Sequence, residues 1–255
     1  MIEPTAANRP ELEAWIANSL RMTAILSPAA QLPEHSFWEE LVGQPPESIT
    51  SQPRTGVHQE DGSFEGGRLS VIVQPARVDW ILTVDDNQAT NSPIPSIGQF
   101  VYLLNVFTDK MTHWLERSPP LQRLAFGSIL LLPMYDESSA RQQLFAYLPF
   151  EPQNFENAQE FLYQINRPRS SSSGISNLQI NRLSKWSALK WRTVNFPLNN
   201  LSNYSASPYS LACCIELDIN TSPDYQEDLP KEKLPQIFRE LVDLGKEIVK
   251  EGDIP

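Results

Sequence analysis

Prolines divide this chain into short segments. Its 255 residues include 22 prolines, roughly twice the usual share of about 5%. Because proline lacks an amide donor and clashes inside a helix, most of the sequence excludes long uninterrupted helices and requires frequent turns. Apolar residues make up 40% of the chain and charged residues 20%, which allows a core and is too apolar for a disordered chain. We therefore expect a folded chain of short elements joined by many loops.

Helices are expected where apolar residues recur every three or four positions. The clearest is 97–116, where six apolar residues form one wide stripe that ends before Pro119 and Pro120. The C-terminal segment has the same spacing and is followed by Gly252. The expected helices are Pro10–Met22, Phe37–Val42, Ile97–Glu116, Glu137–Tyr147 and Glu232–Lys250.

Strands are expected where apolar residues alternate, or run continuously between turn residues. Pro75–Ala76 is short enough to join two of them as a hairpin. Gln44–Gly67 is rich in Pro, Ser, Thr, Gly and Gln and is expected to be a long polar loop. The expected strands are Arg68–Gln74, Arg77–Val84, Gln122–Leu132, Ser187–Phe196, Ser210–Asn220 and a hairpin of the two Gln-Ile-Asn-Arg tetrapeptides at 164–167 and 179–182.

The order of these elements indicates the fold class. Strands come in runs and are not strictly interleaved with helices, which favours a mostly antiparallel sheet. A length of 255 residues favours one domain over two. We expect a single α+β domain over residues 1–255, with the long central helix and the C-terminal helix packed on one face of the sheet and residues 44–67 as its long polar loop.

Three segments flank the expected long helices in a recognisable layout. Val78-Asp79-Trp80 precedes the central helix, Leu121–Pro133 follows it, and Ile215–Asn220 precedes the last helix. This layout, over roughly residues 68–250, resembles a group of sporadically distributed bacterial proteins that are known only as conserved hypothetical proteins. The resemblance implies an α+β bacterial cytoplasmic protein, and it implies no activity and no site residues.

Charge is unevenly distributed along the chain. The net charge is −11, which opposes binding to nucleic acids and acidic membranes. The segment Phe161–Ile215, however, contains six of the 20 lysines and arginines and none of the 31 acids. Basic residues with aromatic neighbours are typical of surfaces that bind anions or single-stranded nucleic acid, because guanidinium groups bind phosphate and flat rings stack on bases. The candidate binding residues are Arg167, Arg169, Arg182, Lys185, Trp186, Lys190, Trp191 and Arg192.

Two other interpretations of this basic segment remain open. In Cys213–Asn220 the side chains of Glu216 and Asp218 point to one face of the expected strand, and an acidic row can pair with a basic row on the neighbouring strand. The basic residues could instead bind the acidic face of a protein partner. Trp186 and Trp191 are five positions apart and face opposite sides of a regular strand, so we expect one to be buried and the other exposed.

The sequence contains no recognisable catalytic set. It lacks a histidine pair at ligand spacing, a Gly-x-Ser-x-Gly turn, a phosphate-binding loop and a dinucleotide fingerprint. We therefore expect no cofactor and assign no catalytic residue and no metal ligand. Glu216 and Asp218 could hold a divalent metal, as in two-metal nucleases, only with a third carboxylate, for which Asp79 is the nearest strand residue.

The two cysteines, Cys213 and Cys214, are adjacent and should point to opposite faces of a strand as a buried, unlinked pair. The low cysteine content and the polar, acidic start of the sequence favour the cytoplasm. The longest apolar runs are too short to cross a membrane.

The function that these observations favour is a non-enzymatic interaction protein: an adaptor, an inhibitor or a subunit of a bacterial cytoplasmic assembly, with a protein partner. One alternative is a module that binds nucleic acid or another anionic ligand through the basic segment 161–215. A second alternative is a metal-dependent nuclease that uses Glu216 and Asp218.

Overall fold

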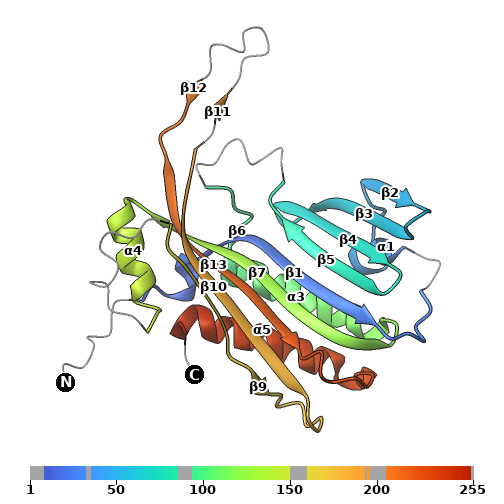
Figure 1. Ribbon diagram of the computed structural model, residues 1–255. Coiled ribbons are helices and arrows are strands. Elements are labelled where there is room, and N and C mark those ends of the chain that lie inside the picture. Colours follow the sequence, from blue (N-terminus) through green and yellow to red (C-terminus); the bar gives the residue numbers. More distant parts are fainter. Residues whose placement is uncertain are drawn as a thin grey trace.

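One large antiparallel sheet with helices on a single face makes up most of this chain (Figure 1). The computed structural model describes residues 9–32, 36–85, 94–149, 160–192, 194–195 and 205–253. Within these residues every strand pair is antiparallel. The long central helix and the C-terminal helix pack on the same face of the sheet. The predicted α+β class is therefore confirmed.

The main sheet has the strand order β2-β3-β4-β5-β1-β7-β13-β10-β8, with β6 beside β1 and β9 beside β10. The short strands β11 and β12 form a separate pair. The strands are β1 (Ile16–Leu26), β2 (Ser48–Gln52), β3 (Val57–Phe64), β4 (Gly67–Gln74), β5 (Arg77–Thr83), β6 (Gly98–Gln99), β7 (Leu121–Met134), β8 (Leu162–Asn166), β9 (Arg169–Ser170), β10 (Gln179–Trp191), β11 (Val194–Asn195), β12 (Ser205–Ala206) and β13 (Ser210–Thr221).

The two halves of the chain repeat one layout. The first half consists of β1, the short helix α1 (Phe37–Val42), strands β2 to β5 and the helix α3 (Phe100–Arg117). The second half consists of β7, the short helix α4 (Glu137–Phe145), strands β8 to β13 and the helix α5 (Leu234–Glu251). In each half the last long strand returns to pair with the first, and an 18-residue helix follows. The first strands of the two halves, β1 and β7, pair at the centre of the sheet.

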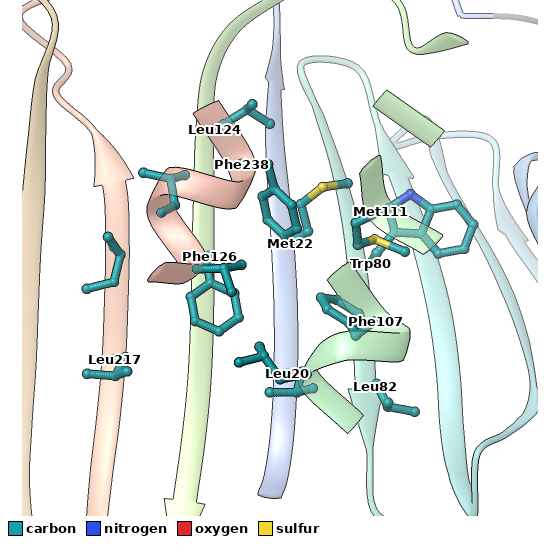
Figure 2. Close-up of a cluster of buried hydrophobic side chains, with 14 of the residues drawn as sticks. Leu20, Met22, Trp80, Leu82, Phe107, Met111, Leu124, Phe126, Leu217 and Phe238 are labelled. Atoms are coloured by element: carbon teal, nitrogen blue, oxygen red, sulfur yellow. The ribbon is translucent and has the colours of Figure 1, made fainter. Parts of the chain in front are cut away.

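The core lies between the sheet and the helices α3 and α5 (Figure 2). In Figure 2, Phe107 of α3 lies over the first half of the sheet and Phe238 of α5 lies beside Phe126 of β7. The rings of Phe126 and Phe238 meet edge to face, with their centroids 6.2 Å apart. A Cβ at Gly245 of α5 would come within 3.0 Å of the Phe126 ring, so this glycine lets the helix approach the sheet closely. Each large side chain buried here contributes about 1.5–3 kcal/mol to stability.

Residues 10–22 do not form the predicted helix. Only Leu12–Ala14 form a turn of 3₁₀ helix, and the chain then continues as β1. Leu20 and Met22 point into the core, and Arg21 points to the other side of the sheet. The local apolar spacing suits a helix, but β1 pairs along its length with both β5 and β7, and these two ladders outweigh the weak local propensity.

Residues 44–67 are not the predicted long loop, because β2 and β3 form a hairpin there and add two strands to the sheet. The polar composition suggested a loop, but Glu60, one of the polar residues of β3, is buried and bonded to helix α1. Glu60 is 3% exposed and accepts hydrogen bonds from Ser36 Oγ and the Trp38 amide, both at 2.9 Å, at the N-terminus of α1. The Trp38 ring occupies the space over Gly62, where a Cβ would lie 2.5 Å from it.

The other predicted helices, and the strands predicted at 68–74, 77–84, 122–132 and 210–220, are confirmed to within a few residues. The predicted hairpin of 164–167 and 179–182 corresponds to β8 and β10, in a register that places Asn166 opposite Leu183. The predicted strand Ser187–Phe196 is not a separate element, because 187–191 continue β10 and 194–195 form β11, and Phe196 lies outside the described residues. Gly43 ends α1 with φ 82°, a conformation that favours glycine. Cys213 and Cys214 are buried, are not disulfide-bonded, and belong to separate clusters on the two sides of the sheet, as expected. Within the described residues, no helix is both long enough and apolar enough to cross a membrane.

Candidate binding surface

The predicted binding residues of the segment 161–215 do not share one surface. Side chains alternate along β10, so Arg182 and Trp186 point toward the helices, whereas Lys185 and Trp191 point to the opposite side of the sheet. Trp186 is fully buried and Trp191 is half-buried. The basic residues therefore lie in at least two separate places.

The three predicted arginines on the helix side pair with acids at the C-terminal end of α5. Arg167 forms a two-pronged pair with Asp253, with Nη2 2.9 Å from Oδ2 and Nε bonded to Oδ1. Arg169 Nη2 lies 2.8 Å from Glu247 Oε1, and Arg182 Nη2 lies 3.4 Å from the same oxygen. These arginines fasten the last helix to the sheet.

The serine-rich turn between β9 and β10 also binds α5. Glu240 accepts hydrogen bonds from Ser171 Oγ at 2.7 Å and from the Ser172 amide at 2.5 Å. Lys233 donates to the Ser173 carbonyl at 2.7 Å. The basic and serine side chains of the segment 161–215, which contains no acid, thus bind acids elsewhere in the chain. This agrees with the interpretation in which basic and acidic residues pair within the protein.

Burial and pairing shift the pKa values of the residues that join α5 to the sheet. Burial alone would raise the pKa of Asp253, but the hydrogen bonds from Arg167 and Tyr163 outweigh it and hold that pKa below its usual value. Burial, followed by the hydrogen bond to Asp253, raises the pKa of Tyr163 to about 12. Burial lowers the pKa of Arg182, and the neighbouring Arg169 adds to this. Asp253 therefore stays ionised at neutral pH.

The predicted aromatic residues and the remaining basic residues are also engaged. Trp186 stacks on Tyr147 with ring centroids 5.2 Å apart and donates its indole N–H to Ser184 at 3.1 Å. Lys190 Nζ lies 2.6 Å from a carboxylate oxygen of Glu137 in α4. A buried indole cannot stack on a base, so Trp186 serves the core.

At the far end of β10 the chain keeps a small exposed basic site. Lys190 Nζ lies 4.6 Å and Arg192 Cζ 5.1 Å from the centroid of the exposed Tyr209 ring. Trp191 packs instead on the small cluster that includes Cys214 on the opposite side of the sheet. These cation–π contacts leave Arg192 exposed.

The opposite side of the sheet has no helix over it among the described residues. We call it the open face; it carries Arg21, Gly127, Ile129, Lys185 and Asp218. At its centre lies a hollow of about 510 Å³, and its lining includes residues of β5, β1, β7, β13, β10 and β8. Both halves of the chain therefore contribute to one concave surface.

The hollow combines paired charges with half-buried apolar side chains. Arg21 lies 3.6 Å from Asp218, and Lys185 lies 2.7 Å from Glu216. Gly127 leaves room for Arg21, since a Cβ there would come within 3.1 Å of the guanidinium. The apolar part of the lining includes Ile81, Ile129 and Leu183.

The carboxylates considered for a metal site are each paired with a basic residue. Glu216 pairs with Lys185, and Asp218 pairs with Arg21. Asp79, the nearest third acid by sequence, is bonded instead to Thr23 and Arg77 at β1 and β5. Within the described part of the chain, no group of three or more His, Cys, Asp or Glu side chains is placed to hold a metal ion.

Sequence reasoning missed Arg21 and the hollow. The segment around Arg21 was assigned to a helix, so its side chain had no expected place on the sheet. One signal was available: Gly127 interrupts an apolar strand, and a glycine inside a strand often marks the close approach of another group.

Comparisons of the chain with protein-family models, with curated proteins and with solved structures find no match.

Proposed function

We propose that this chain is a non-enzymatic interaction protein that binds a protein partner through the open face, as an adaptor, inhibitor or subunit of a bacterial cytoplasmic assembly. The observation that carries the proposal is the hollow at the centre of a sheet face that no described helix covers. Ile81, Ile129 and Leu183 give this surface an apolar centre, and fully buried interface centres are typically apolar and poor in charge.

The ion pairs of the hollow support a protein ligand over an anionic one. Arg21 and Lys185 are already neutralised by Asp218 and Glu216, so the surface offers no net positive charge to a phosphate backbone. A partner that presents apolar side chains could cover the hollow without separating these pairs. The alternative of a nucleic-acid or anionic ligand has its best remaining support at Arg192 and Lys190 beside Tyr209. Among the residues that the structure describes, the nuclease alternative has no third carboxylate placed beside Glu216 and Asp218 to support it.

The test is retention of a stoichiometric partner by variants of the two faces. Leu183→Glu places a charge on the open face of β10, and Lys246→Glu changes a half-buried residue of α5 on the other side of the sheet as a control. We expect the wild-type protein and Lys246→Glu to retain the same partner from a lysate of the source cells, and Leu183→Glu to lose it by at least about tenfold. Circular dichroism and the unfolding midpoint verify that each variant is folded.

Two outcomes would contradict the proposal. One is a wild-type protein that retains no partner in stoichiometric amounts. The other is a partner that Leu183→Glu retains as well as the wild type does, because the open face then takes no part in binding.

A further inference from the structure

Strand β8 forms one edge of the main sheet and pairs on its inner side with β10. Along an antiparallel pair, the backbone N–H and C=O groups of successive residues point alternately toward the partner strand and away from it. The Arg167 amide donates to the Arg182 carbonyl, so every second residue counted back from Arg167 directs its backbone groups to β10. The residues between them direct their backbone groups outward: Leu162, Gln164 and Asn166.

This outer edge of β8 is free and unprotected. Its outward N–H and C=O groups have no hydrogen-bond partner among the described residues, and Leu162 is 57% exposed. Natural sheets protect their free edges with charged residues, prolines or bulges. Leu162–Asn166 contains no charged residue and no proline, and its pairing with β10 runs without a shift of register. The edge can therefore accept another strand along its whole length.

Strand β2, at the opposite edge of the sheet, offers less. The turn between β3 and β4 has two residues, which fixes the alternation of hydrogen bonds along β3 and, through it, along β2. Only Ile49 and Ser51 of β2 then direct their backbone groups outward. Pro46 and Pro53 lie on either side of this strand, and proline has no amide to donate. Of the two edges, β8 is therefore the better one for pairing.

We propose that two copies of this chain pair through their β8 strands in antiparallel orientation and form a dimer with one continuous sheet. With the two-fold axis at Gln164, this residue pairs with the same residue of the second copy, and Leu162 of each copy pairs with Asn166 of the other. This register satisfies every outward N–H and C=O of the edge. It also sets no charge against a like charge, because β8 contains none. A second copy fits because the edge is complementary to itself.

The chain already contains one junction of this kind. Its two halves meet where β1 and β7 pair antiparallel, and both halves keep their long helices on one side of the sheet (Figure 1). A two-fold axis between antiparallel edge strands is perpendicular to the sheet, so the dimer keeps all its helices on one side and sets the two open faces side by side. Gln164 is part of the lining of the hollow, so each hollow reaches the junction. The dimer itself does not depend on what binds the open face.

The first test is sedimentation velocity of the purified full chain from about 1 to about 300 µM. A narrow interface of this kind is weak and reversible, so we expect the fraction of dimer to rise over this range. A protein that stays monomeric at every concentration would overturn the proposal.

A proline variant assigns the dimer to this edge. Gln164→Pro removes an outward amide and leaves the hydrogen bonds to β10 intact, and proline is tolerated where the amide of an edge strand faces solvent. We expect this variant to be folded and monomeric at about 300 µM. Ser51→Pro is the matched control, because it removes an outward amide from the β2 edge, and it should dimerise as the wild type does. A dimer that survives Gln164→Pro, or that Ser51→Pro also abolishes, would place the interface elsewhere and refute the assignment.

Two further measurements apply even if Gln164→Pro does not fold. Gln164→Lys sets two ammonium groups against each other at the axis and should weaken the dimer at least about tenfold at low salt. In the wild type, the amides of Leu162, Gln164 and Asn166 should exchange hydrogen more slowly at high protein concentration than at low concentration, whereas those of Ile49 and Ser51 should not change. Exchange at β8 that is independent of concentration, or a full dimer in Gln164→Lys, would contradict the proposal.

Discussion

The two halves of this protein share one layout but hold their long helices differently. Helix α3 of the first half is held mainly by apolar side chains, including Phe107 and Met111. Helix α5 of the second half has a similar apolar side, and its polar side is also bound by the turn after β9 and by the arginines of the acid-free segment. The same arrangement of strands and helices can thus be stabilised mainly by apolar packing, or by apolar packing together with a buried cation.

One buried charge in each half lies beneath a helix end, and its sign suits the helix dipole. Glu60 lies at the N-terminus of α1, where free amides and the helix dipole favour a negative group. Arg182 and Arg167 lie near the C-terminal end of α5, where the dipole favours a positive group. Each half therefore places a charge beneath a helix end: a negative charge at an N-terminus in the first half and a positive charge at a C-terminus in the second.

The largest expected effect is in the first half. Phe107→Ala should lower the free energy of unfolding by about 3–5 kcal/mol, because it leaves a cavity between α3 and the sheet. The loss should be the same at low and high salt, since no charge is involved. Urea unfolding at two salt concentrations measures it. A loss that depends strongly on salt would contradict the distinction between the halves.

A similar or slightly smaller effect is expected from Arg182→Ala in the second half. Removing this buried cation should cost about 3 kcal/mol, because Glu247 keeps only Arg169 as its partner. Hydrogen exchange should show faster exchange in α5 than in α3. Arg192→Ala is the matched control. Equally faster exchange in both helices would contradict a specific role of Arg182 in holding α5 on the sheet.

A third prediction concerns pH. The pKa of Asp253 is lowered in the folded protein, so its pairing stabilises the fold above the pKa of the unfolded chain and is lost as pH falls through the folded value. Asp253→Asn should cost about 1.5 kcal/mol at pH 7 and progressively less as the carboxylate of the wild type is protonated. Unfolding free energies measured from pH 7 to pH 2 test this. A constant difference across that range would show that ionisation is not involved.

The smallest effect is expected at the surface. Lys190→Ala breaks an exposed ion pair with Glu137, and exposed pairs contribute little because water screens them. We expect no measurable change in the unfolding midpoint. A shift as large as that of Arg182→Ala would mean that an exposed basic residue stabilises the fold as much as a buried one does.

The sequence alone determined the elements whose signal is local. The apolar stripe of 97–116 predicted α3, the same spacing predicted α5, and the run after Pro120 predicted β7; together they indicated an antiparallel α+β fold. The segregation of charge was also visible, as were the opposite orientations of Cys213 and Cys214. These patterns repeat within a few residues, so they do not depend on which strands meet.

Only the tertiary structure decided where the charges face and what they bind. The segment 10–22 became a strand because β5 and β7 lie on either side of it, and 44–67 became two strands because β3 pairs with both β2 and β4. Arg182 and Lys185 are three positions apart, yet one is buried under α5 and the other lies in the open hollow. Strand partners and helix docking bring together residues far apart in the chain, and no local pattern specifies which distant residues these are.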